Sequence, residues 1–332
     1  MTNSRQTVLA PASEGLPATV LAADSRQRLD VWLQEHRPSV EAMLLQHGGI
    51  AFRGFHCPDH AAFGEAIRRM GSSALRIKEE SSRRVDLGGG IFTATEHPAD
   101  FDIFLHHECS YSLTVPARVF FFCADRDGQG GETLLADGYR IWALIPTVLR
   151  QRFQRRGWAL HRRYGNGLGV SWQQAYATDR VEDVSTYCAE QGTEVHWIDT
   201  TLVTRQQRAA TLTHPTTGRP VWFNHICFFH RSAIPSDLLE LLLAEGRGLP
   251  FDTTYGDDQP IEPDVLDELR SAYRACSVCY EWRAGDVLVL DNLRIAHGRR
   301  AFSGTRQLLF AAADPVRVPV HVAAAGGGFS GN

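Results

Sequence analysis

A split set of metal-ligating residue types constrains the fold of this chain most strongly. His106 and Glu108 stand two positions apart in LHHECSY, and His297 follows much later in DNLRIAHGRR. Two imidazoles and one carboxylate can occupy one face of an octahedral Fe(II) ion and leave the opposite face open. A closed structural zinc site would need four protein ligands. If these three residues share one ion, both halves of the chain must belong to one core.

The residues around both parts of this set predict extended structure. FDIFLHHECSY is rich in aromatic and branched residues, which favours a strand with His106 and Glu108 on one side and His107 on the other. In the distal segment, turn residues alternate with apolar runs, which predicts turn, strand, turn and strand at 285–286, 287–290, 291–292 and 295–298. An isolated His-x-Glu pair also arises by chance among fourteen histidines. Whether the pair binds a metal therefore has to be judged from the surrounding sequence.

Four sequence blocks lie in order between about residues 45 and 315. They are HGGIAFRGF, HHECSYSLTVPARVFFFCADRDGQGGETLLAD, HPTTGRPVWFNH and GDVLVLDNLRIAHGRRAFSGTR. Together they resemble the taurine dioxygenase (TauD/TfdA-like) family of Fe(II)- and 2-oxoglutarate-dependent oxygenases. The resemblance implies a mainly β fold with helical insertions, namely a double-stranded β-helix (a cupin-like jelly roll). It also implies Fe(II), with 2-oxoglutarate and O2 as co-substrates.

The resemblance assigns roles residue by residue. The residues that match the family's iron ligands are His106, Glu108 and His297. Thr133, in GGET, matches the threonine that hydrogen-bonds the co-substrate, and Arg306 matches the arginine that pairs with the distal carboxylate of 2-oxoglutarate. A guanidinium can hold a carboxylate through two parallel hydrogen bonds, so this role suits the chemistry. Arg299 and Arg300 compete for it, but we interpret them as a solvated basic turn.

Two departures from the family pattern bear on the reaction. Glu108 stands where many members carry aspartate, which resembles the branch of clavaminate synthase, the free arginine and asparagine hydroxylases and the SyrP-like hydroxylases. Halogenating relatives have a small residue there, so we do not expect halogenation. Phe310 stands where taurine dioxygenase has the arginine that binds the sulfonate, so we do not expect an alkylsulfonate substrate.

Substrate identity is weakly encoded. Asn224 and His225, in WFNH, are candidate substrate-binding residues, and Phe310 is expected to line the same space. Arg83 and Arg84 precede LGGGIFTAT and could bind a carboxylate, although a solvated turn is the interpretation that we favour for the pair. The resemblance therefore predicts a small amino-acid-like substrate, free or presented by a carrier protein.

The predicted reaction is hydroxylation of an unactivated C–H bond of an amino acid or amino-acid derivative in specialised metabolism. Desaturation or cyclisation with the same cofactors stays open. The alternative from a different class is a metal-binding β-barrel without redox activity, or a zinc hydrolase on the same three residues. Thr133 and Arg306 count against that alternative, because neither a metal-binding barrel nor a zinc hydrolase requires a pocket for a dicarboxylate.

The whole-chain properties fit one catalytic domain. No Pro/Ser tract or charge block reads as a linker in the 332 residues, so we expect a flexible lead-in over 1–20, a single catalytic domain over 21–320 and a disordered tail over 321–332. A net charge of −4 provides no basic footprint for nucleic acid. No apolar run is long enough to span a bilayer, and the N-terminus lacks a signal core, so we expect a cytoplasmic protein.

The seven cysteines are scattered and odd in number, which argues against a disulfide framework. The Cys276–Cys279 spacing suits a zinc or redox pair, but no second pair matches it, so we do not expect that function. Helical periodicity predicts helices at 59–70, 235–245 and 261–275, a pair over 138–157, and two helices over 25–47 broken near Pro38. Strands are expected at 103–110 and 117–123, with a less regular section at 158–213.

Overall fold

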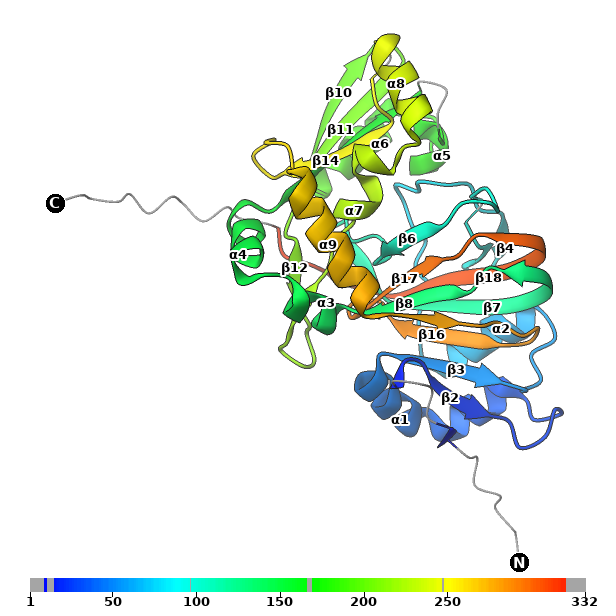
Figure 1. The fold of residues 1–332 in the computed structure, drawn as a ribbon. Helices are drawn as coiled ribbons and strands as arrows, with labels where there is room; N and C mark the ends of the chain where they lie inside the picture. Colours follow the sequence, from blue (N-terminus) through cyan, green and yellow to red (C-terminus); the bar gives the residue numbers. More distant parts are fainter. Residues whose placement is uncertain (1–8, 11–14, 96, 166–168, 247, 321–332) are drawn as a thin grey trace, which may run out of the picture.

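The computed structural model describes residues 9–10, 15–95, 97–165, 169–246 and 248–320. Two facing β-sheets form its centre, with helices packed outside them (Figure 1). The larger sheet runs, in spatial order, β1 (Leu9–Ala10), β2 (Ala18–Leu21), β3 (Gly49–Arg53), β16 (Val287–Asp291), β7 (Thr114–Gly130), β18 (Phe302–Arg317), β5 (Ile91–Thr93) and β4 (Asp86–Gly88). The smaller sheet runs β15 (Ser277–Tyr280), β8 (Thr133–Asp137), β17 (Ile295–Arg299) and β6 (Ile103–His106).

Strand β7 shows how the larger sheet separates two cores. Successive side chains of a strand point to opposite faces. Phe120 and Phe122 accordingly pack outward against helices α1 (Leu29–His47) and α2 (His60–Arg69). Phe121 points inward and packs between the sheets with residues of the smaller sheet such as Leu135 and Ile295. The larger sheet is therefore buried on both faces at β7, and the core between the two sheets includes Ile295 of β17.

Two predictions for the N-terminal part are wrong. Residues 29–47 form the single helix α1, in which Pro38 lies on the exposed side, where water can satisfy the carbonyl that proline leaves unpaired. Trp32 and Val40, one on each side of Pro38, pack into the same core and keep the two halves aligned. The predicted lead-in over 1–20 also includes β2, which pairs in parallel with β3 and buries Val20 completely. Residues 1–8, 11–14 and the predicted tail 321–332 lie outside the described residues.

A second region stands beside the smaller sheet (Figure 1). Its antiparallel sheet consists of β10 (Thr193–Ile198), β11 (Thr201–Arg208), β9 (Trp158–Tyr164) and β14 (Phe251–Tyr255), and a hairpin joins β12 (Thr211–Thr213) to β13 (Pro220–Trp222). The helices are α3 (Gly138–Leu144), α4 (Thr147–Arg156), α5 (Trp172–Tyr176), α6 (Val181–Glu190), α7 (Ile226–Phe229), α8 (Ser236–Ala244) and α9 (Pro263–Ala275), with a 3-10 turn at Arg231–Ala233. Section 158–213 is thus more regular than predicted, whereas the expected helices at 59–70, 138–157, 235–245 and 261–275 are confirmed.

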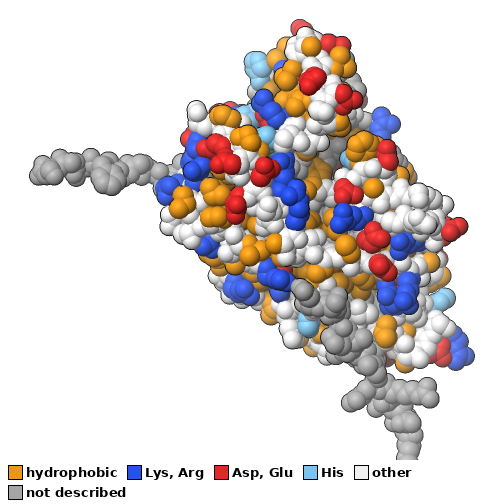
Figure 2. Space-filling view, viewed as in Figure 1, with side chains coloured by type: hydrophobic (Ala, Val, Ile, Leu, Met, Phe, Trp, Pro, Cys, Tyr) orange, Lys and Arg blue, Asp and Glu red, His pale blue; other side chains and the backbone are white. Residues whose placement is uncertain are grey.

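The surface charge and the cysteines indicate no additional function. Figure 2 shows Lys and Arg side chains interspersed with Asp and Glu over the visible face. Among the described helices, none is both long and apolar enough to cross a membrane. All seven cysteines are free thiols, and Cys276 is buried with its Sγ directed at the Ala272 carbonyl, whereas Cys279 is exposed. The structure therefore gives no support to a Cys276–Cys279 metal or redox pair.

Candidate metal centre and its pocket

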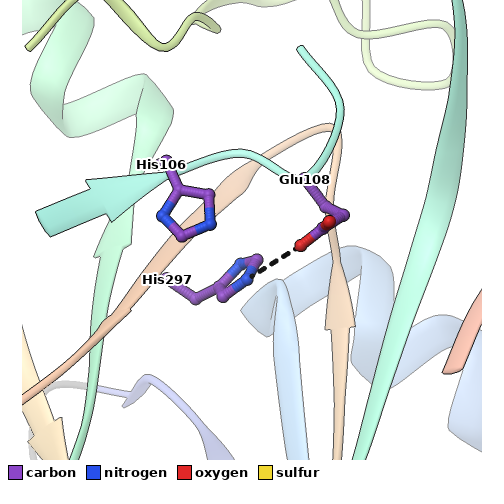
Figure 3. A group of neighbouring side chains, drawn as sticks. All are labelled: His106, Glu108 and His297. Atoms are coloured by element: carbon purple, nitrogen blue, oxygen red, sulfur yellow. Dashed lines mark ion pairs between the residues drawn. The ribbon is translucent and has the colours of Figure 1, made fainter. Parts of the chain in front are cut away.

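Strand pairing brings the two predicted histidine ligands together. His297 of β17 is the direct register partner of His106 of β6. Their ring centroids are 4.7 Å apart, and Figure 3 shows both rings beside the Glu108 carboxylate. Directly opposite residues on neighbouring strands project to the same face, so the register alone places the two imidazoles side by side.

Glu108 reaches the same point in a way that the sequence did not predict. Strand β6 ends at His106, and Glu108 lies in the following turn, where Cys109 adopts a φ of 57° that a strand cannot continue. Asn292 replaces the strand neighbour: its Oδ1 accepts from the Glu108 backbone N–H at 2.7 Å, and its Nδ2 donates to the Glu108 carbonyl at 3.1 Å. His107 points away, with its ring nitrogens near the carbonyls of Asn292 and Trp222.

The donor atoms of the three residues fit a metal ion. One ligand atom from each of His106, Glu108 and His297 lies within 4.8 Å of the others. The Nδ1 of His106 is 2.8 Å from the Phe104 carbonyl, which holds the ring proton there and leaves Nε2 with a free lone pair. His297 Nδ1 is buried and has no hydrogen-bond partner within the described residues. No other cluster of His, Cys, Asp or Glu in the described part of the chain has this arrangement.

Electrostatics favour the metal-binding protonation states. Burial, followed by the nearby His297, lowers the pKa of His106 to about 3, so its imidazole is neutral. Burial is the largest influence on Glu108 and opposes its ionisation, but the Arg84 guanidinium, together with His297 and His106, outweighs burial and holds the pKa of this carboxyl well below its usual range. Neutral imidazoles and an ionised carboxylate are the forms that bind a divalent cation.

The three residues open into a pocket of about 570 Å³ that Thr133 and Arg306 also line. Arg306 uses Nε to donate to the Gly131 carbonyl at 2.9 Å, and no residue in the described ranges forms an ion pair with its guanidinium. Burial, and then the neighbouring Arg299, lower the pKa of Arg306 to about 10. A buried guanidinium in this condition is unfavourable until an anion pairs with it, as expected of a site for a carboxylate.

Thr133 is prepared to donate a hydrogen bond. Its Oγ1 accepts a 2.8 Å hydrogen bond from the indole Nε1 of Trp282, and its side chain is buried. A hydroxyl that accepts from an indole still has its own proton to donate. Trp282 is a residue that the sequence analysis missed, and no local pattern distinguishes it from an ordinary core tryptophan.

Two predictions about arginine pairs are corrected by where the structure places the side chains of Arg83, Arg84, Arg299 and Arg300. Arg83, the predicted substrate residue, is exposed and does not line the pocket, whereas Arg84 does and donates from Nη2 to Glu108 Oε1 at 3.1 Å. Arg299 is not solvated, since it is buried and donates to the carbonyls of residues 97, 98 and 101. Arg300 is exposed, as predicted. Sequence alone cannot tell which arginine of an Arg-Arg pair faces inward, because that depends on the path of the backbone.

Of the remaining candidate substrate-binding residues, His225 and Phe310 line the pocket and Asn224 does not. Asn224 does not line the pocket: its Nδ2 donates to the Ala210 carbonyl and its Oδ1 accepts from the Ile226 N–H, so the fold uses both of its polar atoms. His225 does line the pocket, with Nδ1 2.6 Å from Ser110 Oγ. Phe310 lines it too, and the Arg84 guanidinium carbon lies 4.1 Å from the centroid of its ring.

Comparison with known proteins now identifies the family. Residues 13–312 match the family described as taurine catabolism dioxygenase TauD, TfdA family. The dapdiamide synthesis protein DdaC of Enterobacter agglomerans is 32% identical over 311 residues, which cover 92% of this chain and 94% of DdaC. This chain belongs to the TauD/TfdA family. A clavaminate synthase-like protein of Arabidopsis thaliana is 25% identical and covers 91% of each chain.

Solved structures agree with the TauD/TfdA assignment at the level of the fold. PvcB of Pseudomonas aeruginosa, described as an Fe, alpha-ketoglutarate dependent oxygenase from an isonitrile synthetic pathway, matches with a TM-score of 0.52 and 16% identity, covering 91% of this chain and 89% of PvcB. A taurine dioxygenase of Burkholderia xenovorans matches with a TM-score of 0.52 and 17% identity, covering 90% and 87%. The predicted jelly roll is confirmed.

As a TauD/TfdA member, the protein is a 2-oxoglutarate-dependent dioxygenase that uses Fe(II), 2-oxoglutarate and O2. These cofactors together supply the oxidising power for attack on a C–H bond, and the chain supplies placement and exclusion of water. The predicted enzyme class and cofactors are therefore confirmed. The alternative of a metal-binding barrel without redox activity is wrong, because family membership contradicts it.

Proposed function

We propose that the protein hydroxylates an unactivated C–H bond of an amino acid or amino-acid-derived substrate, either free or presented by a carrier protein. The observation that carries the proposal is the convergence of His106, Glu108 and His297 in one pocket that also contains Arg306, whose guanidinium has no ion-pair partner among the described residues. The relative DdaC, named for dapdiamide synthesis, supports a biosynthetic role.

In the proposed site, His106, Glu108 and His297 hold Fe(II). Arg306 binds the distal carboxylate of 2-oxoglutarate, and Thr133 donates a further hydrogen bond to it, with Trp282 fixing the hydroxyl. His225 faces the substrate side of the pocket, where Ser110 fixes its ring. Burial, and then His106, lower the pKa of His225 well below its ordinary value, so it meets the substrate as a neutral donor or acceptor.

Hydroxylation is favoured over halogenation because Glu108 fills the ligand position that halogenating relatives leave to a small residue. Desaturation or cyclisation would use the same residues, and the product distinguishes them. Hydroxylation adds one oxygen atom to the substrate, whereas desaturation removes two hydrogen atoms and leaves the oxygen count unchanged.

Anaerobic titration with Fe(II) and 2-oxoglutarate tests the proposed ligand assignment. We expect the weak visible charge-transfer band of a chelated 2-oxo acid in the wild type and its loss in His106→Ala. Succinate release on admission of O2, screened over free and carrier-bound amino acids with mass analysis of the product, then identifies the substrate. A wild-type protein that never develops the band, or whose product carries no additional oxygen atom, would contradict the proposed function.

A further inference from the structure

Among the described residues, five arginines line the pocket, and their hydrogen bonds divide them by role. They are Arg84, Arg162, Arg163, Arg299 and Arg306. Arg162 donates to the backbone carbonyls of residues 79 and 80, and Arg299 donates to three carbonyls within residues 97–101. The fold therefore already uses Nη1 and Nη2 of both side chains to fasten segments 79–80 and 97–101, and the remaining Nε of Arg299 is buried.

Arg163 and Arg306 are also excluded as substrate ligands. Arg163 follows Arg162 on β9, and neighbouring residues of a strand point to opposite faces. Arg162 pairs with the buried Thr204, whereas Arg163 pairs with the half-buried Val203, so the Arg163 side chain lies on the face of this sheet opposite to Arg162, with its guanidinium beside Gly248. Arg306 is assigned above to 2-oxoglutarate. Arg84 is left as the pocket arginine that can receive an anion of the substrate.

The environment of Arg84 suits this role. Its side chain is only 10% exposed. Nη2 donates to Glu108 Oε1 at 3.1 Å and to Thr95 Oγ1 at 3.2 Å, and the guanidinium stacks 4.1 Å from the centroid of Phe310. Nε and Nη1 have no hydrogen-bond partner among the described residues, and no other side chain there accepts from them. The stack and the ion pair fix the guanidinium while leaving two donors free.

The electrostatic surroundings of Arg84 contain two carboxyl groups. Glu108 is the ion-pair partner, and a bound divalent cation would compensate its charge. Glu80 also interacts electrostatically with Arg84, but it does not line the pocket, and burial raises its pKa above the ordinary value. Glu80 therefore does not occupy the pocket side of the guanidinium, and Glu108, which lines the pocket, accepts only from Nη2 of Arg84.

Arg84 also changes the interpretation of Phe310. Phe310 stands where taurine dioxygenase has its sulfonate-binding arginine, which led us not to expect an alkylsulfonate substrate. In the structure, a guanidinium from a different segment of the chain lies over the Phe310 ring. The wall is therefore cationic in this chain too, although the charge comes from residue 84.

We propose that Arg84 determines substrate specificity by binding a free carboxylate of the substrate through the nitrogens that Glu108 and Thr95 do not use. This inference rests on the proposed function and narrows it. Because the same guanidinium is hydrogen-bonded to the proposed ligand Glu108, the carboxylate lies beside the metal centre. The C–H bond attacked then belongs to a carbon close to that carboxylate. A substrate whose only carboxylate is masked as an ester or thioester leaves the Arg84 donors unpaired.

The test uses the full chain with Fe(II) and 2-oxoglutarate under anaerobic conditions. The probes are the standard amino acids, each as the free acid and as its methyl ester, and binding is read from the change in the visible charge-transfer band. In the wild type we expect at least one free acid to bind about tenfold or more tightly than its ester, since a hydrogen bond to a charged group contributes about 1.5–3 kcal/mol. Arg84→Gln should lose this preference.

Two further variants complete the design. Arg83→Gln removes the neighbouring exposed arginine and should behave as wild type. Arg84→Lys keeps the charge and loses the planar fork, so it should retain part of the preference; it also serves if Arg84→Gln fails to fold.

Several results would overturn the inference. They are an unchanged preference in Arg84→Gln, equal binding of acids and esters by the wild type, and a wild-type band that no free acid shifts. An Arg84→Gln protein that folds but no longer forms the band would also overturn it, because Arg84 would then act only by positioning Glu108. Failure of the proposed function looks different, since the wild-type band would then be absent from the start.

Discussion

Arg53, in the larger sheet, and Arg306, in the pocket, are two partly buried arginines in opposite chemical situations. Arg53 donates from Nε and Nη2 to both oxygens of Asp286, and Nη2 also contacts the Tyr280 hydroxyl and the Glu281 carbonyl. Hydrogen bonding to Asp286 raises the pKa of Arg53 despite burial. Burial, and then Arg299, lower the pKa of Arg306 to about 10, and no carboxylate among the described residues pairs with its guanidinium. A satisfied buried charge belongs to the fold, whereas an unsatisfied one indicates a binding site.

The largest effect should come from the metal ligands themselves. His297→Ala removes a proposed ligand, and we expect loss of stoichiometric Fe(II) binding and of 2-oxoglutarate turnover. Isothermal titration with Fe(II) under anaerobic conditions measures this. His60→Ala, which changes an exposed histidine on α2, is the matched control and should bind iron normally. A His297→Ala protein that keeps full iron affinity would show that the metal lies elsewhere.

Asp286→Ala should cost stability and spare the cofactor site. It leaves Arg53 buried without its carboxylate, which lowers the free energy of unfolding by about 3–5 kcal/mol. Urea unfolding measures this change. The fraction that remains folded should bind 2-oxoglutarate with nearly wild-type affinity, and a selective loss of that affinity would break the distinction between the two arginines.

Arg306→Ala should show the reverse pattern. We expect 2-oxoglutarate affinity to fall roughly 10- to 100-fold, because charge-assisted hydrogen bonds contribute about 1.5–3 kcal/mol. Iron affinity and the free energy of unfolding should change little, since the mutation removes a partly buried cation that has no ion-pair partner among the described residues. Arg300→Ala is the exposed control. Equal losses of iron and 2-oxoglutarate binding would contradict the assigned role.

Thr133→Val should have a smaller effect in the same direction. It keeps the shape of the side chain and removes the hydroxyl between Trp282 and the expected carboxylate. We expect 2-oxoglutarate to bind roughly tenfold more weakly, the equivalent of one hydrogen bond to a charged group. Equilibrium titration of the visible band measures it, and unchanged affinity would remove Thr133 from the co-substrate site.

The smallest expected effect concerns Glu79, a buried acid two residues before Ser81, which lines the pocket. Burial raises its pKa above the ordinary 4.5, although Arg162 and Arg208 oppose the shift. The folded state thus holds this proton more tightly than the unfolded chain, so the ionised group opposes folding at high pH, and its penalty disappears as pH falls through the folded pKa. Glu79→Gln should be the more stable protein at neutral pH, with the difference narrowing in acid. The midpoints of urea unfolding of both proteins, measured from neutral to acid pH, check this. A stability difference that widens in acid would contradict a raised pKa for Glu79.

The sequence predicted the parts of this site that depend on residue type and order. His106, Glu108, His297, Thr133 and Arg306 all line one pocket, as the resemblance implied. The predictions failed where contacts between distant segments determine the path of the backbone or the burial of a side chain. Glu108 leaves the strand because Asn292 captures its backbone groups from far along the chain. Arg299 is buried because three carbonyls of another segment accept from it.

By itself, the sequence determined the donor set, the cofactor class and the family, because these follow from which chemical groups the chain carries and in what order. Only the tertiary structure decided which arginine faces inward, which polar side chains the fold already uses, and that a guanidinium lies over Phe310. The reason is physical. A side chain has its donors and acceptors wherever it stands, but whether they are free depends on neighbours that only folding brings close.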